Sequence, residues 1–337
     1  MLNTIIASII MFGILIFAHE FGHFIVAKWA RIKVLEFAIG FGKELIGWQR
    51  GATRFTLRIV PLGGFCRLFG EDPEEAGGEG SFQSKPLGWR FAVISAGSLF
   101  NFLLGALLLT LLYFFFLGAP QTDLTRIGEV LPEGRAYEAG LKSGDKILAI
   151  NNNPVQNWDA VVSKISAYPE EEITMLLERD GKEIDFTLVP AEQEGLGRIG
   201  IAPVFEKYAF FTSIYLGFSY TWFFIQLVFV SLFQMIAGTI PADVAGPVGI
   251  GAVVGEVMQE GLSNLLSLAA IISINLGIIN LLPIPALDGS RLVFLALEGI
   301  RGKPVDPQKE GFIHFIGFAL LMMLMIFIIF QDISRLV

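Results

Sequence analysis

The sequence contains few cysteines and few charged residues, the residues that stabilise small secreted proteins and bind nucleic acid. Cys66 is the one cysteine among 337 residues, which excludes an internal disulfide framework and a cysteine-based zinc site. Charged residues make up 17% of the chain, the net charge is −8 and basic runs are missing, so nucleic acid is excluded as the main partner. Histidine is also scarce, with three residues, so the placement of each one is informative.

Apolar sequence is abundant instead. Hydrophobic residues are 53% of the chain and the mean hydropathy is +0.63, which is typical of a membrane protein. No Lys or Arg precedes Lys28, so the apolar N-terminus lacks the charged region of a cleaved signal peptide. A bilayer span takes about 20 residues. Four segments are long enough, and we place them near 4–28, 91–118, 263–283 and 312–330.

Basic residues are unevenly shared between the connecting segments. The loops 30–90 and 284–311 are rich in Lys and Arg, whereas residues 119–208 carry 9 Lys and Arg against 16 Asp and Glu. The positive-inside rule therefore predicts cytoplasmic basic loops, with the acidic stretch and both termini outside. A fifth apolar stretch, 209–237, would invert this topology if it crossed the membrane. We predict that it forms a helix in the outer interface, with a fifth span as the alternative.

Two segments between the spans have strand-like patterns. Residues 33–70 combine many glycines with short alternating runs, which predicts two or more strands apolar enough to touch the membrane. Residues 126–190 contain short strands and turn signals, including the hairpin signal "RDGKE". Within them, "YEAGLKSGDKILAINNNPV" (137–155) resembles the core of a bacterial PDZ domain, with Asn153 where that pattern usually has glycine.

The stretch "LIFAHEFGHFIVA" (15–27) places ionisable side chains deep in the first span. His19 and His23 are four residues apart on a helix, so both imidazoles project from one face and can bind one metal ion. Glu20 stands next to them and can act as a base on a metal-bound water, which is the chemistry of HExxH zinc peptidases. An ionisable group at that depth in a membrane indicates a functional site.

A catalytic zinc site needs a third protein ligand and one open position. The better candidate is Asp288 in "INLLPIPALDGSRL" (279–292), because it follows the third span where that span reaches the cytoplasmic side. Asp288 could instead cap the helix that follows it. His314 in "GFIHFIG" is the other candidate, and we interpret it as an interfacial residue at the start of the last span.

These motifs together carry a family resemblance. HEFGH (19–23) in a first membrane helix, "NLLPIPALDG" (280–289) after a later one and a PDZ-like insert between them resemble the site-2 intramembrane metalloproteases, of the bacterial regulator-of-sigma-E protease type. The likeness continues through "GFG" at 40–42, "PLGGF" at 61–65 and "GPVGI" at 246–250. It implies the following roles: zinc ligands His19, His23 and Asp288, general base Glu20, and substrate-handling residues Asn280, Pro283 and Pro285.

The resemblance also implies a fold. We expect a polytopic α-helical membrane protein with about four transmembrane helices, a re-entrant membrane-associated β region and an inserted α+β PDZ-like domain. Members of this subgroup often carry two PDZ domains in tandem, and this chain has room for one. The expected segments are a first half of the membrane core at 1–118, a PDZ-like domain at 119–200 (core 126–190), a linker at 201–262 and a second half of the core at 263–337.

The expected function is an intramembrane zinc endopeptidase that cleaves single-pass membrane proteins, such as anti-sigma factors or remnant signal peptides, in regulated intramembrane proteolysis. The β region would pair with the unwound substrate, because a peptide bond in a helix is hidden by its own hydrogen bonds. The protein would lie in the cell membrane, with the active site toward the cytoplasmic side. The PDZ-like domain would lie outside, where it would bind peptide tails or filter substrates by size.

Two other functions stay open at this point. The chain could be a membrane-anchored PDZ binding module with a structural or non-catalytic metal site. It could also be a metal transporter, which would need several intramembrane polar residues along a path, whereas the other spans are nearly bare of charge.

Overall fold

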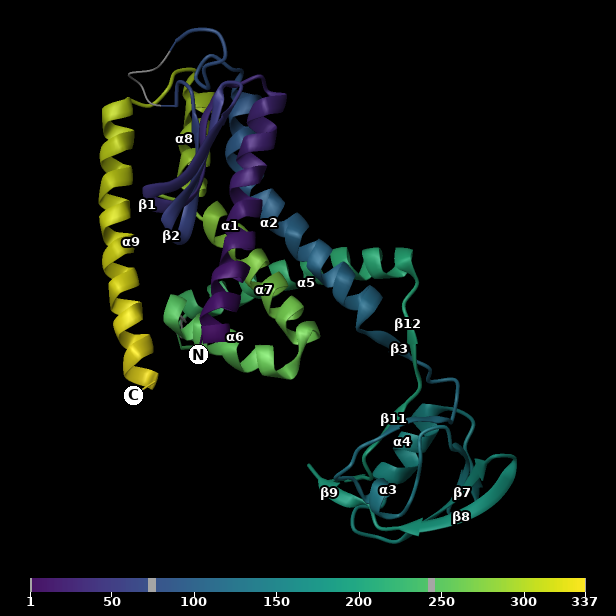
Figure 1. Cartoon of the computed structure of the whole chain (residues 1–337). Helices are drawn as coiled ribbons and strands as arrows, with labels where there is room; N and C mark the ends of the chain where they lie inside the picture. The colour runs from purple at the N-terminus through teal and green to yellow at the C-terminus, as the bar shows by residue number, and fades with distance from the viewer. Residues whose placement is uncertain (1, 72–76, 242–245, 337) are drawn as a thin grey trace. The chain divides into compact units, whose positions relative to one another are not determined.

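The computed structural model describes residues 2–71, 77–241 and 246–336 (Figure 1). The chain divides into two compact units. One unit joins residues 1–112 to 211–337, and we call it the membrane core. The other, residues 113–210, contains the PDZ-like domain.

Five helices within the described residues are long and apolar enough to cross a membrane. Four of them cover the predicted spans, and the fifth covers the ambiguous apolar stretch. The chain is therefore a multi-pass membrane protein with a strand-rich insert. The five helices are α1 (Leu2–Trp29), α2 (Leu87–Phe115), α5 (Phe210–Ile236), α7 (Leu262–Leu281) and α9 (Pro307–Leu336).

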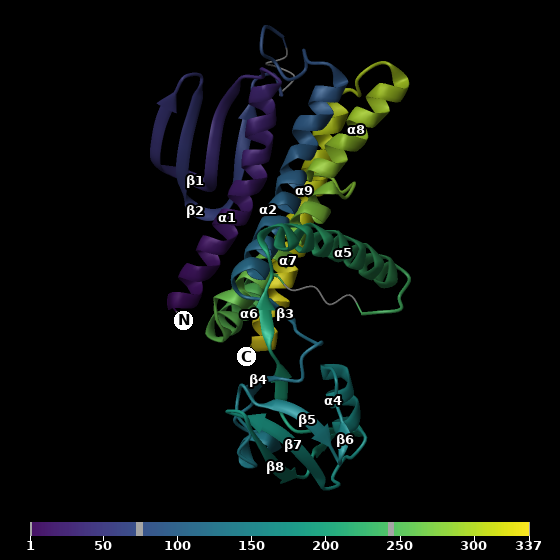
Figure 2. The ribbon, with the colours of Figure 1, turned by 90° about the vertical axis from the view of Figure 1, so that its right-hand side faces the viewer.

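The ambiguous helix α5 runs across the other helices of the membrane core in both views (Figures 1 and 2). The next helix, α6 (Pro247–Glu260), lies at the end of the core where the chain begins and ends: its Gly255 abuts Thr4, and its first turn donates backbone hydrogen bonds to Asp332 of α9. A helix that crossed the membrane before α6 would have delivered it to the opposite end. Its location in the outer interface stays a prediction.

The segment that is predicted to re-enter the membrane is a small antiparallel sheet beside α1, built from β1 (Val34–Arg50) and β2 (Thr53–Leu68) (Figure 2). Each strand bends in the middle, near glycines with positive φ such as Gly40 and Gly63, because a left-handed backbone is accessible to glycine. The two strands therefore form four segments, in the order 64–68, 34–39, 54–57 and 46–50. The segment 64–68 is one edge of this sheet.

A short helix, α8 (Asp288–Arg301), follows α7 at the end of the core opposite the chain termini (Figure 1). Two ion pairs hold α8 in place: Arg90 of α2 pairs with Glu298, and Arg291 pairs with Glu71, which follows β2. Apolar contacts of Leu295 with the α1–α2 layer add to them. The first residue of α8 is thereby fixed relative to α1.

The PDZ-like domain packs one apolar core between short helices and a four-stranded sheet in the order β6-β5-β7-β8. The hairpin predicted at "RDGKE" joins β7 to β8, with positive φ at Asp180 and Gly181. The elements of residues 113–210 are β3 (Gly118–Pro120), β4 (Ile127–Val130), α3 (Arg135–Glu138), β5 (Lys146–Ile150), β6 (Asn153–Pro154), α4 (Trp158–Ser166), β7 (Ile173–Arg179), β8 (Lys182–Leu188), β9 (Ala191–Gln193), β10 (Leu196–Arg198), β11 (Ile201–Pro203) and β12 (Phe205–Lys207).

Candidate metal centre

Helices α1 and α8 bring three potential metal ligands together. The Nε2 atoms of His19 and His23 lie 3.3 Å apart on one face of α1. The Oδ2 atom of Asp288 lies 3.2 Å from the first and 3.1 Å from the second. Residues 288 and 19 are far apart in the sequence, so this grouping is a product of the fold.

The three atoms fit a zinc ion. A tetrahedral zinc with bonds of about 2.0–2.1 Å has ligand atoms about 3.3 Å apart, close to the separations seen here. The Nδ1 of His23 donates to the carbonyl of Val93 at 2.8 Å, which leaves the Nε2 lone pair free. Asp288 Oδ2 is buried and accepts no hydrogen bond from the described residues. Nitrogen and oxygen lone pairs that point to one place, with no hydrogen-bond donor between them, are typical of a cation-binding site.

Helix α2 supplies a supporting face that sequence reasoning missed. Val93, Gly97 and Asn101 are spaced by four residues, so they line one side of the helix, and this side meets the two histidines. A side chain at Gly97 would collide with both imidazoles. The spacing "VxxxGxxxN" was the available signal, but it is also compatible with ordinary helix packing.

Asn101 completes the support of His19. It is fully buried, and its amide nitrogen lies 3.3 Å from His19 Nδ1. The amide oxygen has no hydrogen-bond donor among the described residues. With the amide turned over, that oxygen would accept from the Nδ1–H of His19. This tautomer directs the Nε2 lone pair of His19 toward Asp288.

Glu20 lies half-buried beside the edge segment of the sheet. A Cβ at Gly64 of β2 would come within 3.0 Å of the Glu20 Cγ, so strand and side chain are in van der Waals contact. Its carboxylate receives no hydrogen bond from any residue that the structure describes. The carboxylate is therefore available to a water or substrate.

The other predicted site residues lie around the same turn of chain. Asn280 is half-buried in the last turn of α7, and Pro283 and Pro285 lie in the loop that joins α7 to α8. Asp288 does not cap α8, because the helix begins at this residue and Leu287 occupies the N-cap position. His314 is on α9, outside the group of potential ligands.

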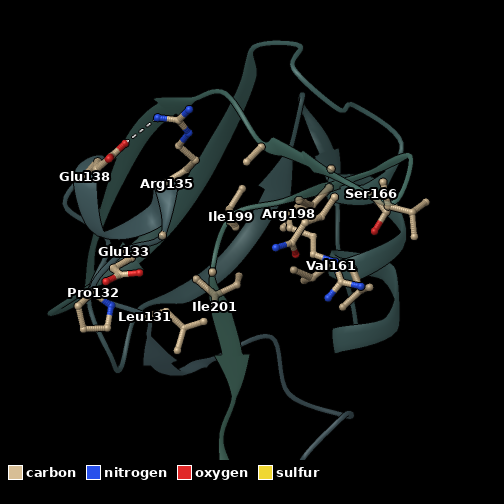
Figure 3. Close-up of a pocket in the computed structure, with 18 of the residues that line it drawn as sticks. Leu131, Pro132, Glu133, Arg135, Glu138, Val161, Ser166, Arg198, Ile199 and Ile201 are labelled. Carbon is tan, nitrogen blue, oxygen red and sulfur yellow. Dashed lines mark hydrogen bonds and ion pairs between the residues drawn. The ribbon is translucent and has the colours of Figure 1, made fainter. Parts of the chain in front are cut away.

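The PDZ-like domain contains a separate groove of about 920 Å³. Val161 and Ser166 of α4 lie on one side and Leu131 and Ile201 on the other (Figure 3). Arg135 lies at its border, where it pairs with Glu138. The groove thus combines an apolar lining with charged groups at its rim.

Comparison with known proteins places the whole chain in one family. The profile of Peptidase family M50 matches residues 7–324. The zinc metalloprotease RasP of Geobacillus kaustophilus is 38% identical over 99% of this chain and 98% of its own length. The regulator of sigma-W protease RasP of Bacillus subtilis is 34% identical over 99% of both chains.

Two details qualify these matches. The Geobacillus alignment runs over 420 positions, more than the 337 residues of this chain, so that relative contains segments that this chain lacks. Among solved structures, the PDZ domain of the SdrC-like protein from Listeria monocytogenes is 19% identical, with a TM-score of 0.23, over 24% of this chain and 88% of its own length. The match over residues 7–324 decides the assignment, and the chain belongs to peptidase family M50, the site-2 protease family.

Proposed function

We propose that this chain is an intramembrane zinc endopeptidase that hydrolyses peptide bonds in or near the transmembrane segments of single-pass membrane proteins. The observation that carries the proposal is the triangle of ligand atoms from His19, His23 and Asp288. Glu20 lies beside this triangle, and its carboxylate receives no hydrogen bond from a described residue. A structural zinc site would more often have four protein ligands. The relatives named as zinc metalloproteases agree with this reading.

Different residues of the chain would transfer the proton and orient the zinc ligands. When bound, zinc supplies a Lewis acid that polarises the peptide carbonyl and makes a water acidic enough to lose a proton near neutral pH. Glu20 takes the proton from the attacking water and delivers it to the leaving amine. Val93 and Asn101 hold the two imidazoles in the orientation that the ligands need.

The edge segment 64–68 is the proposed docking place for the substrate backbone. Its outer side pairs with no further strand among the described residues, and Gly64 brings it against Glu20. A substrate helix must unwind before it is cleaved, and a strand edge gives the freed amides new partners. Asn280, Pro283 and Pro285 would contact the same stretch of substrate from the opposite, α7 side.

The proposed orientation follows from charge. Arg291 belongs to α8 and Arg90 pairs with Glu298 of the same helix. Helix α8 lies at one end of the membrane core, and both chain termini lie at the other end (Figures 1 and 2). The positive-inside rule then makes the α8 end cytoplasmic, with the metal centre in that half of a cell membrane. The PDZ-like domain would be extracytoplasmic, and its groove would bind the peptide tails of substrates. Anti-sigma factors and remnant signal peptides are the proposed substrate class.

The test is a single exchange in the full-length protein. Glu20→Gln should retain zinc at one ion per chain and lose cleavage of a reporter with one transmembrane segment, while Asp288→Ala should lose both. Zinc content is measured on purified protein and cleavage in proteoliposomes. Turnover by Glu20→Gln at the wild-type rate would reject the catalytic assignment and leave the chain as a metal-containing binding protein.

A further inference from the structure

His314 is the histidine that the metal centre leaves unused. It lies on α9, and its Nδ1 accepts a hydrogen bond from the backbone N–H of Ala286 at 3.1 Å. Its ring also contacts Phe294 of α8, with ring centroids 5.8 Å apart. His314 therefore touches both the loop between α7 and α8 and the helix that begins at Asp288.

The loop backbone at Ala286 needs such support. Its φ is +74°, in the left-handed region that residues with a Cβ rarely adopt. A conformation of this kind persists where the surrounding structure holds it. The N–H of Ala286 donates to His314, and no second acceptor for it is found among the described residues. Asp288 follows two residues later, so the direction of its carboxylate depends on this backbone.

Helix α9 reaches the same loop at a second point. Gly317, one turn after His314, lies against Pro285, and a side chain at this glycine would collide with the proline. Many other large apolar side chains of α9 are exposed, and near its C-terminal end the helix contacts α6 through Asp332. The contacts of His314 and Gly317 with successive loop residues are therefore a specific docking point.

The hydrogen bond from the Ala286 N–H determines which nitrogen of the His314 imidazole carries the proton. Because Nδ1 accepts, the ring proton is on Nε2. That nitrogen is buried, makes no hydrogen bond to a described residue and lies 3.8 Å from a Glu310 carboxylate oxygen. A nearby negative charge favours a proton on Nε2. An apolar side chain of similar size could fill the space but could not accept from Ala286.

We propose that His314 is a positioning residue of the metal centre, which fixes the loop backbone at Ala286 and through it the carboxylate of Asp288. It makes α9 part of the support of a ligand that lies on α8. The inference rests on the proposed function, because it takes His19, His23 and Asp288 as the zinc ligands.

The first test compares two exchanges of the same residue in the purified full-length protein. His314→Leu should weaken zinc binding by about tenfold, the lower end of the effect of outer-shell partners on metal affinity, and should lower kcat more than it changes KM. His314→Asn, which places an acceptor near the position of Nδ1, should restore both toward wild type. Phe315→Leu, on the exposed neighbouring position, is the matched control. Zinc affinity is measured by competition with a chelator.

The second test reads the ring state of His314 in the wild-type protein, and a variant is used for signal assignment alone. The chain has three histidines, so ¹⁵N-histidine spectra of the wild-type protein in micelles resolve few signals, and His314→Asn identifies one of them. We expect the Nε2-protonated tautomer at His314. An Nδ1-protonated ring, or equal zinc affinity of wild type and His314→Leu, would overturn the inference. Retention of zinc by Asp288→Ala would instead contradict the proposed function, so the two failures are distinguishable.

Discussion

At the scale of single residues, the proposed metal centre relies on side chains and backbone groups that are not themselves proposed ligands. His23 is oriented by a backbone carbonyl of α2, whereas His19 is oriented by the side chain of Asn101. A backbone carbonyl cannot be removed by substitution, so Asn101 is the member of this support that mutation can test. Asn101 is fully buried, and its amide oxygen has no hydrogen-bond partner among the described residues.

Asn101→Leu should weaken zinc binding by about 10- to 100-fold, because the tautomer and tilt of His19 would no longer be fixed. Asn101→Asp keeps an acceptor for Nδ1–H and should retain most of the affinity. Zinc competition titrations on both variants measure the effect. Ser95→Ala on the same helix, whose hydroxyl bonds only to its own helix backbone, is the control. Equal zinc affinities for the wild type and these three variants would show that Asn101 contributes packing and does not orient His19.

The sequence predicted best those site residues that are close to one another along the chain. His19 and His23 are four residues apart, so helix periodicity alone predicted their shared face, with Glu20 next to His19. Asp288 required the span count to place it at the same depth. Asn101 was missed because its partner is 82 positions away and an asparagine in an apolar helix has no ligand signature of its own.

At the scale of elements, the sheet edge and helix α1 are in contact at Gly64 and Glu20. Gly64 lies against Glu20 and against the carbonyl of Ala38 in the neighbouring segment. The glycines of residues 33–70 indicated turns and short strands. They did not reveal that each strand bends to give four segments, because that order depends on pairing between residues far apart in the sequence.

Gly64→Ala should lower kcat/KM for a transmembrane substrate by at least about tenfold, since a near-attack geometry is sensitive to shifts below 1 Å. The new Cβ would lie 2.8 Å from the Ala38 carbonyl oxygen and 3.0 Å from the Glu20 Cγ, so strand or base must move. Zinc content should stay at the wild-type level. Gly13→Ala on α1, which has open space around it, is the control. A normal cleavage rate for Gly64→Ala would contradict the edge as the docking place.

Hydropathy alone does not decide between a fifth span and an interfacial helix for α5. Its apolar window is as long as that of a span, yet the helix runs across the core and leads into α6 at the end where the termini lie. Composition measures affinity for the membrane and says nothing about direction within it. The distribution of Lys and Arg carried the directional information.

At the scale of the whole molecule, the chain consists of two units with separate apolar cores. The PDZ-like domain has its own core of residues from 127 to 199. Among the described residues, none of the core clusters of the membrane core includes a residue of that domain. Stability of the insert and zinc binding by the membrane core should therefore respond to different substitutions. The acidic, turn-rich composition of residues 119–208 is the sequence signal for an insert, and the compact unit runs from 113 to 210.

Asp145 offers a test of that independence. Burial alone would raise the pKa of its carboxyl, but two hydrogen bonds of 2.6 Å from Arg179 and one of 2.8 Å from the Lys142 N–H hold this pKa below its usual value. A carboxyl with a lowered folded-state pKa stabilises the fold above its unfolded pKa of about 3.9. That contribution is lost as the pH falls through the lower, folded-state value.

Asp145→Asn should destabilise the PDZ-like domain by about 2 kcal/mol at pH 7, because a charge-assisted pair is lost from a buried site. It should also flatten the dependence of stability on pH below about 4. Hydrogen exchange of peptides from 146–188, corrected for the intrinsic rate at each pH, measures both effects in the full-length protein, with the exposed Asp185→Asn as the control. Zinc affinity should stay unchanged, because the ligands belong to the other unit. A parallel loss of zinc affinity would mean that the two units are energetically coupled, and the insert would then act on the metal centre as well as on substrates.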